Sequence, residues 1–247
     1  MYTKPGNKAA LLVPLVLCLF FLPTSGCDQQ SAENHKTPKL EIPGEVRGVF
    51  DAIENCAKEK KPLIVAMDFD PSTREECGPM AEAILRHCFS RDIRVIVTTF
   101  IPSSIDLSKQ ILDTIAKEME KRNHEDYVFL GYKPSLAQVI LNMGKDFKKA
   151  YPTDAAGTDI GLIKAMEGVK NFDDIGLTIS ISGTPIPETW IFFAHHYYQA
   201  NVAVGTTAVS ATTYYPYFKA GQIKGFLPGI SGAAAYRELL RDLPHEE

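Results

Sequence analysis

Long apolar runs, surplus basic charge and glycine or proline repeats are all missing from this sequence of 247 residues. Its 17 glycines and 16 prolines form no repeat, which excludes collagen-like chains. Hydrophobic residues make up 45% of the chain and charged residues 23%, so a wholly disordered chain is excluded as well. We therefore expect a globular body.

The one extended apolar stretch, residues 9–22, follows Lys4 and Lys8 and is interrupted by Pro14. A membrane-spanning helix needs about 20 apolar residues, so this stretch is short for one. Basic residues, a short apolar core and then Pro-Thr-Ser-Gly-Cys are typical of a secretory signal. We expect residues 1–26 to be removed, and an uncleaved N-terminal anchor is the alternative.

Residues 22–27, Leu-Pro-Thr-Ser-Gly-Cys, resemble a bacterial lipobox, in which the cysteine receives a lipid and the chain is cut just before it. Ser25 and Gly26 are the small residues that such a site takes, whereas Thr24 stands where an aliphatic residue is usual. The resemblance implies a lipid on Cys27 and a lipid-anchored protein of the bacterial cell envelope, facing outside the cytoplasm. An ordinary secretory cleavage nearby, with Cys27 as a free thiol, is the alternative.

Cysteine is too scarce for a disulfide framework. Once Cys18 leaves with the signal and Cys27 carries lipid, only Cys56, Cys77 and Cys88 remain. Cys77 and Cys88 fall in one expected helix with about 16 Å of rise between them, so they cannot bond to each other. We expect three buried thiols, with a bond from Cys56 to either of the others as the alternative. No Cys-x-x-Cys pair or Cys/His cluster predicts zinc, and we expect neither metal nor cofactor.

Basic residues are also too few for a nucleic-acid partner. Removal of residues 1–26 leaves 24 basic and 30 acidic residues, a net charge of −6. Nucleic-acid binding depends on Lys and Arg that neutralise phosphates, so this class is excluded. The densest basic run, Lys58, Lys60 and Lys61 around Glu59, has the pattern of a solvated helix end.

After a polar tether at residues 27–43, helical and strand patterns alternate along the chain. Strands are expected at 63–69, 93–101, 127–130, 175–182 and 201–206. Helices are expected at 44–59, 72–91, 104–121, 135–149, 161–169 and 187–199, followed by a Thr- and Tyr-rich loop at 206–218 and a Gly-rich helical segment at 220–240. This alternation predicts one three-layer, Rossmann-like α/β domain over residues 44–243, with a mainly parallel sheet of about five strands. Residues 244–247 form a polar tail.

Polar side chains stand at or just after the ends of four expected strands. They are Asp68, Asp70, Thr98, Thr99, Ser182, Thr184, Thr206 and Thr207. Because parallel strands place their carboxyl ends at one edge of the sheet, we expect these residues in one crevice that binds a ligand or a partner. The alternative is that they are ordinary turn formers.

The segment Ile-Val-Ala-Met-Asp-Phe-Asp-Pro-Ser, residues 64–72, resembles the first signature of haloacid-dehalogenase-like phosphatases. The resemblance implies Asp68 as nucleophile, Asp70 as acid/base and magnesium beside them. Ser72 stands where that family has Thr or Val, and no lysine followed by an acidic pair ends a later strand. The alternative is structural, because residues 72–76 contain two overlapping capping boxes and Asp70 can bind backbone N–H groups at the helix start.

Familiar catalytic motifs are missing. The sequence has no Ser-His-Asp order, no nucleophile elbow, no dinucleotide-binding glycine motif and no P-loop. His195 and His196 are adjacent and point to different faces of one expected helix, so they make a poor metal pair.

Glycines recur every four residues near the C-terminus, at Gly221, Gly225 and Gly229, with Gly232 after them. We expect close backbone packing inside the domain, with a partner or the bilayer as the alternative surface. This segment, with Asp-Phe-Asp-Pro-Ser and Tyr-Pro-Tyr, resembles an uncharacterised family of bacterial membrane-associated α/β proteins over residues 62–240. The resemblance implies no activity.

The leading expectation is an exported, membrane-tethered α/β protein that binds a small ligand or a protein partner at the carboxyl edge of its sheet. The alternative is a magnesium-dependent phosphate-ester hydrolase that uses Asp68 and Asp70. A two-lobed solute receptor is disfavoured, because one sheet of this size lacks a second lobe.

Overall fold

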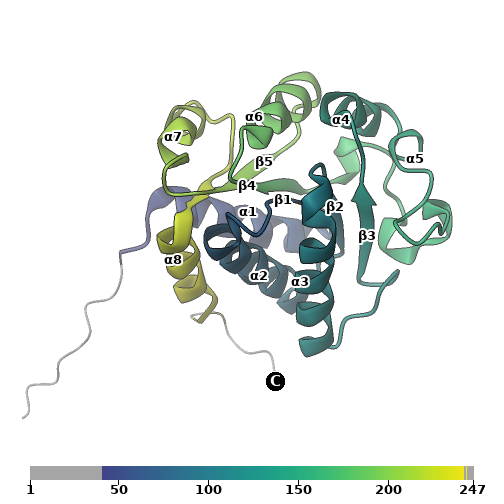
Figure 1. Cartoon of the computed structure of the whole chain (residues 1–247), viewed down its shortest axis with the longest axis horizontal. Coiled ribbons are helices and arrows are strands. Elements are labelled where there is room, and N and C mark those ends of the chain that lie inside the picture. The colour runs from purple at the N-terminus through teal and green to yellow at the C-terminus, as the bar shows by residue number, and fades with distance from the viewer. Residues whose placement is uncertain (1–40, 242, 244–247) are drawn as a thin grey trace, which may run out of the picture. The chain divides into compact units, whose positions relative to one another are not determined.

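The computed structural model describes residues 41–241 and residue 243. The expected signal, Cys27, most of the tether and the polar tail lie outside the described residues. Within them the chain forms a six-stranded sheet with helices on both faces (Figure 1).

All six strands are parallel and lie in the order β3-β2-β1-β4-β5-β6. They are β1 Leu63–Asp68, β2 Val95–Thr99, β3 Tyr127–Tyr132, β4 Leu177–Ser182, β5 Val202–Thr206 and β6 Phe226–Pro228. Nearly every strand residue is buried, as expected for a sheet covered on both faces, and this explains the near-continuous Val and Ile runs. The three-layer, Rossmann-like prediction is confirmed, with six strands in place of about five.

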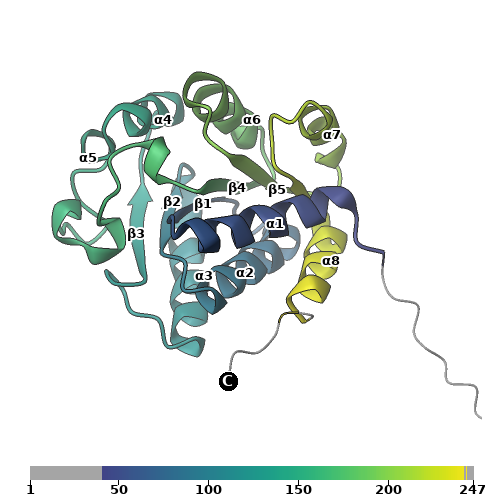
Figure 2. The same cartoon turned by 180° about the vertical axis from the view of Figure 1, so that it is seen from behind.

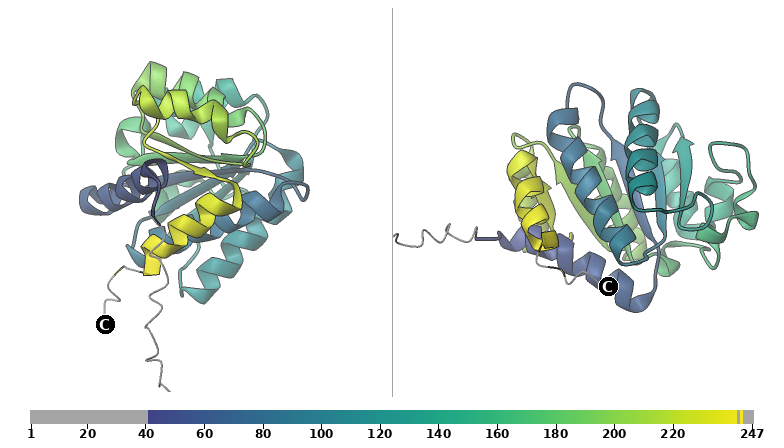
Figure 3. Two further views of the ribbon diagram at one scale, coloured as in Figure 1. Left: turned by 90° about the vertical axis from the view of Figure 1, so that its left-hand side faces the viewer. Right: turned by 90° about the horizontal axis from the view of Figure 1, so that it is seen from below.

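Two hydrophobic cores lie on the two faces of the sheet, and Figure 3 shows the sheet between its helical layers. One face is covered by α1 Gly44–Glu59, α2 Arg74–Ser90, α3 Ile105–Glu118 and α8 Gly229–Arg241. The other is covered by α4 Leu136–Lys145, α5 Phe147–Ala150, α6 Ile186–Trp190 and α7 Ala211–Lys219. In α1, Val46, Val49, Ile53 and Cys56 form the buried stripe, and the helix packs against α8 and β6 (Figure 2).

The C-terminal third differs most from the expected pattern. The Thr- and Tyr-rich segment contains α7, because Ala211 and Tyr214 are buried on one helical face and Tyr214 packs near Phe226. The Gly-rich segment expected to be helical first forms β6 and only then α8. In both segments the local sequence favoured a different secondary structure, and burial against the sheet determined the one that forms.

Two further expected helices are also modified. Residues 161–169 form two short 3₁₀ turns, Ile160–Leu162 and Lys164–Met166, and Gly168, with a φ of +81°, ends the helical run. Helix α6 continues into a π-helix, Ile191–His196, where residues up to 199 were expected to be α-helical. Short 3₁₀ turns also occur at Pro102–Ser104 and Phe172–Asp174.

The glycines near the C-terminus pack inside the domain. A Cβ atom on Gly225 would lie 2.2 Å from the Glu45 carbonyl oxygen, and one on Gly48 would lie 2.1 Å from the Lys224 carbonyl oxygen. The backbones of α1 and of the segment before β6 therefore touch directly, and only glycine fits on either side. Gly221 instead serves a turn, with a φ of +71° and open space around it.

Candidate functional site

The carboxyl ends of four strands meet in one row at one edge of the sheet. Asp68 of β1 pairs with Ser182 of β4, which pairs with Thr206 of β5, and Thr99 ends β2 on the other side of β1. The strand order reverses between β1 and β4, which is where open α/β sheets bind their ligands. We call this row and the loops that follow it the carboxyl edge.

Asp68 is fully buried at the centre of this edge. Its Oδ1 accepts hydrogen bonds from the Phe100 backbone N–H at 2.5 Å and from the Thr99 hydroxyl at 3.2 Å, while its Oδ2 has no partner among the described residues. Loss of solvation raises the pKa of Asp68 to about 7. The carboxyl group is therefore largely protonated below neutral pH.

Asp70 has a different environment, at the turn between β1 and α2. Its Oδ1 accepts from the Ser72 backbone N–H at 2.9 Å and from the Ser72 hydroxyl. These hydrogen bonds hold the pKa of Asp70 below its usual range. The side chain of Thr73, the residue before α2, makes no capping hydrogen bond, so neither expected capping box forms and Asp70 orders the turn instead.

Thr98 and Thr99 lie on opposite faces of β2. The Thr98 hydroxyl donates to the Gly131 carbonyl at 3.1 Å and lies 2.5 Å from the Tyr151 hydroxyl, whereas Thr99 bonds to Asp68. Tyr151 is fully buried, and loss of solvation raises its pKa. Through these hydrogen bonds, Thr98 links β2 to β3 and Thr99 links β2 to β1 at this edge of the sheet.

On the other side of Asp68, hydroxyls link β4 and β5 to their loops. Ser182 donates to the Asp68 carbonyl oxygen at 2.7 Å and lies 2.9 Å from the Thr184 hydroxyl. Thr207 donates to Ser210 at 3.2 Å, and the Thr206 hydroxyl has no partner among the described residues. Of the eight expected site residues, only Asp70 and Thr184 are not buried.

Sequence reasoning missed a layer of buried polar atoms between the sheet and the segment that contains α6. Five buried polar side-chain atoms have no hydrogen-bond partner among the described residues. They are Asp68 Oδ2, the hydroxyl oxygens of Thr178, Ser180 and Thr206, and Trp190 Nε1. The alternation Thr-Ile-Ser-Ile-Ser in β4 was the available signal, because every second residue of this buried strand is polar. Such atoms call for ordered water or a small polar ligand.

The loops of the carboxyl edge pack against one another. A Cβ atom on Gly183 would lie 2.6 Å from the Thr73 methyl group and 3.3 Å from the Thr207 methyl group. The Glu76 carboxylate accepts from the Ala208 backbone N–H at 2.7 Å. These contacts join the loops after β1, β4 and β5.

Two apolar side chains stand out on the surface of this edge. Val209, in the loop after β5, is 88% exposed, and Ile230, at the start of α8, is 54% exposed. Large exposed apolar side chains near one another are typical of interaction surfaces. Ala208, next to Val209, would contact a Cβ atom on Gly229, next to Ile230, so the two side chains belong to one region.

The part of the chain that the structure describes contains neither a group of metal ligands nor a disulfide bond. Within residues 41–241 no three His, Cys, Asp or Glu side chains form a group that could hold a metal ion. Cys56, Cys77 and Cys88 are buried free thiols, as expected. No helix in the same range is long and apolar enough to cross a membrane.

No protein-family model, no curated protein and no solved structure matches this chain.

Proposed function

We propose that this chain is an exported protein, tethered to a bacterial membrane through a lipid on Cys27, that binds a partner protein through the carboxyl edge of its sheet. The leader pattern of residues 1–27 supports export and tethering. The resemblance to membrane-associated α/β proteins of unknown activity agrees with this proposal.

One observation carries the choice of a protein partner over a small ligand. Thr73, Gly183 and Thr207 pack together where the strand order reverses, and a Cβ atom on Gly183 would already lie 2.6 Å from the Thr73 methyl group, so the point directly above Gly183 is closed to a ligand. The same edge exposes Val209 and Ile230, which a protein surface can cover.

Substitution of Val209 tests this proposal. Native electrophoresis of membrane extracts is expected to show the full chain in a complex larger than one chain. Val209→Asp places a charge in the interface and is expected to release the single chain. The matched control is Leu162→Asp, since Leu162 is 83% exposed on a 3₁₀ turn outside the carboxyl edge. Equal mobility of both variants would contradict the proposal.

The hydrolase alternative has less support from the geometry. Asp68 is buried and its Oδ1 is occupied by two donors, and Asp70 is held by Ser72. A nucleophilic carboxylate must instead reach its substrate. Magnesium-dependent hydrolysis of p-nitrophenyl phosphate, abolished by Asp68→Asn, would favour the hydrolase. We expect no turnover that depends on Asp68.

A further inference from the structure

A basic pocket lies at the opposite, amino edge of the sheet, where α1 and α2 end and β1 and β2 begin. Its volume is about 350 Å³, within the range of small-molecule sites. Four of its lining residues are cationic, namely Lys60, Lys61, Arg91 and Arg94, and Asp92 is the one acidic residue in the lining. The sequence places these residues some 30 positions apart, and the fold brings them together.

The local charge opposes that of the whole chain. The chain has a net charge of −4, yet cations dominate this pocket. Asp92 is already paired with Lys121, which lies outside the lining. Within residues 41–241 no carboxylate lies within 4.0 Å of the charged groups of Lys60 and Arg94, whereas Lys61 has a loose contact with Glu59 at 3.6 Å. Arg94 Nη1 donates to the Glu167 carbonyl oxygen at 2.7 Å, so part of its guanidinium is already used.

The basic side chains of the pocket are not needed to cap the two helices that end beside it. The Cys56 carbonyl at the end of α1 accepts from the Lys61 backbone N–H at 3.1 Å. The Cys88 carbonyl at the end of α2 accepts from the Ile93 backbone N–H at 2.9 Å. Because backbone groups close both ends, the basic side chains are not needed as caps there.

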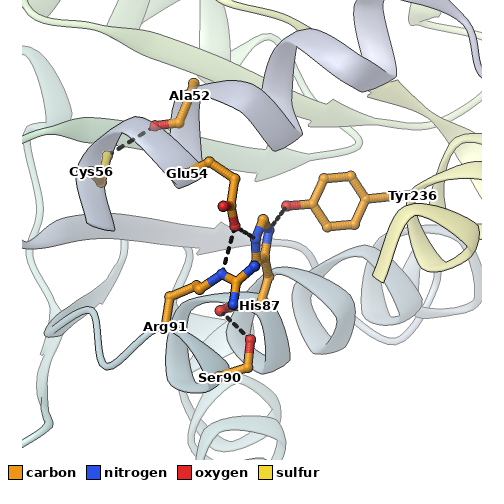
Figure 4. A network of polar contacts seen from close by, with 7 residues as sticks. All are labelled: Ala52, Glu54, Cys56, His87, Ser90, Arg91 and Tyr236. Carbon is orange, nitrogen blue, oxygen red and sulfur yellow. Dashed lines mark hydrogen bonds and ion pairs between the residues drawn. The ribbon is translucent and has the colours of Figure 1, made fainter. Parts of the chain in front are cut away.

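A partly buried network of hydrogen bonds holds Arg91 in place (Figure 4). Glu54 Oε1 accepts from Arg91 Nε at 2.8 Å and lies 2.7 Å from His87 Nε2, and His87 Nδ1 lies 2.6 Å from the Tyr236 hydroxyl. Phe50 stacks on His87 with ring centroids 4.6 Å apart. Glu54 uses only Arg91 Nε, which leaves the two terminal amino groups of the guanidinium for another acceptor.

We propose that this basic pocket binds a phosphate-bearing anion. The ammonium groups of Lys60 and Lys61 and the terminal amino groups of Arg91 supply charge-assisted donors, and arginine matches the geometry of phosphate oxygens in particular. Arg94 adds positive charge, although its Nη1 already donates to the Glu167 carbonyl oxygen. Lys60 is exposed, Lys61 is partly exposed, and Glu54 holds Arg91 in place before the anion arrives. The proposal does not depend on the carboxyl-edge function, because the two sites use different residues at opposite edges.

Inorganic pyrophosphate is the probe that tests the proposal. Added to the full chain at millimolar concentration, it is expected to raise the melting temperature, whereas sodium chloride at matched ionic strength does not. Lys60→Ala and Lys61→Ala are each expected to weaken pyrophosphate binding about tenfold. Lys58→Ala is the matched control, because Lys58 is exposed on the same helix end but does not line the pocket.

The same measurement distinguishes two sources of the phosphate. Vesicles that contain phosphatidylglycerol are added in one arm and pure phosphatidylcholine vesicles in another. Competition with pyrophosphate by the anionic vesicles alone would assign the pocket to a lipid headgroup, and lack of competition to a soluble phosphate compound. No thermal shift with pyrophosphate, or equal affinity in wild type and both lysine variants, would overturn the proposal.

Discussion

Burial without a charged partner among the described residues determines the pKa of Asp68. Among the residues that the structure describes, no cation neutralises the carboxyl group, and the Phe100 N–H and the Thr99 hydroxyl alone stabilise its charged form. Retaining a buried acid in this way costs stability when the acid is charged. We infer that the neutral acid is the form that the edge accommodates best.

Stability is therefore expected to fall as the pH rises through the range in which Asp68 ionises. The pKa rises from 3.8 to about 7 on folding, so the unfolded chain releases this proton at lower pH than the folded chain. The free energy of unfolding loses on the order of 4 kcal/mol from this group between about pH 4 and pH 7. Urea titrations across this range measure the loss. Asp68→Asn cannot ionise and is expected to show a smaller decline, and an unchanged decline would contradict the assignment.

Removal of the Tyr236 hydroxyl tests the hydrogen-bond network of Glu54, His87 and Tyr236. Tyr236→Phe leaves His87 Nδ1 buried without a partner, and we expect the free energy of unfolding to fall by about 1–3 kcal/mol. Tyr215→Phe is the control, because the Tyr215 hydroxyl donates a hydrogen bond to a different kind of partner, the Glu45 carboxylate, and Tyr215 is 39% exposed. Chemical denaturation of both variants measures the difference. Equal small losses would show that the His87 contact is unimportant.

At the scale of elements, the contact between α1 and the segment before β6 depends on two facing glycines. Gly225→Leu would force a side chain into the Glu45 carbonyl and the Val49 N–H, and we expect a loss of roughly 1–3 kcal/mol or more. Gly44→Ala is the control, since a Cβ there meets nothing within 4 Å. Thermal melts decide the matter, and an unchanged midpoint for Gly225→Leu would contradict the internal contact.

The sequence predicted the first five strands because apolar runs of Val and Ile mark a parallel sheet. It missed β6, which has only three residues, one of them Pro228, and lies among glycines. It predicted that polar residues gather at the carboxyl edge, since parallel strands require this. It gave no means to see that Thr73 packs on Gly183 or that Arg91 and Arg94 meet Lys60, because such contacts depend on loop paths and helix lengths together.

At the scale of the whole molecule, membrane attachment is expected to depend on a single thiol. Cys27→Ala removes the acceptor of the proposed lipid, so the chain is expected to leave the membrane fraction or to stay unprocessed. Cys18→Ala lies inside the expected leader and is the matched control. Fractionation and the mobility of the mature chain measure both effects. Retention and processing of Cys27→Ala equal to wild type would refute lipid tethering.

The central claim, that a protein partner covers the carboxyl edge, is tested most directly by photo-crosslinking in cells. A crosslinking amino acid is placed in the full chain at Thr184 or Val209 on the edge, or at Leu162 or Lys58 elsewhere, and all four positions are exposed. We predict a discrete protein adduct from Thr184 and Val209 and none from Leu162 or Lys58. No adduct from either edge position, or equal adducts from all four, would contradict the account.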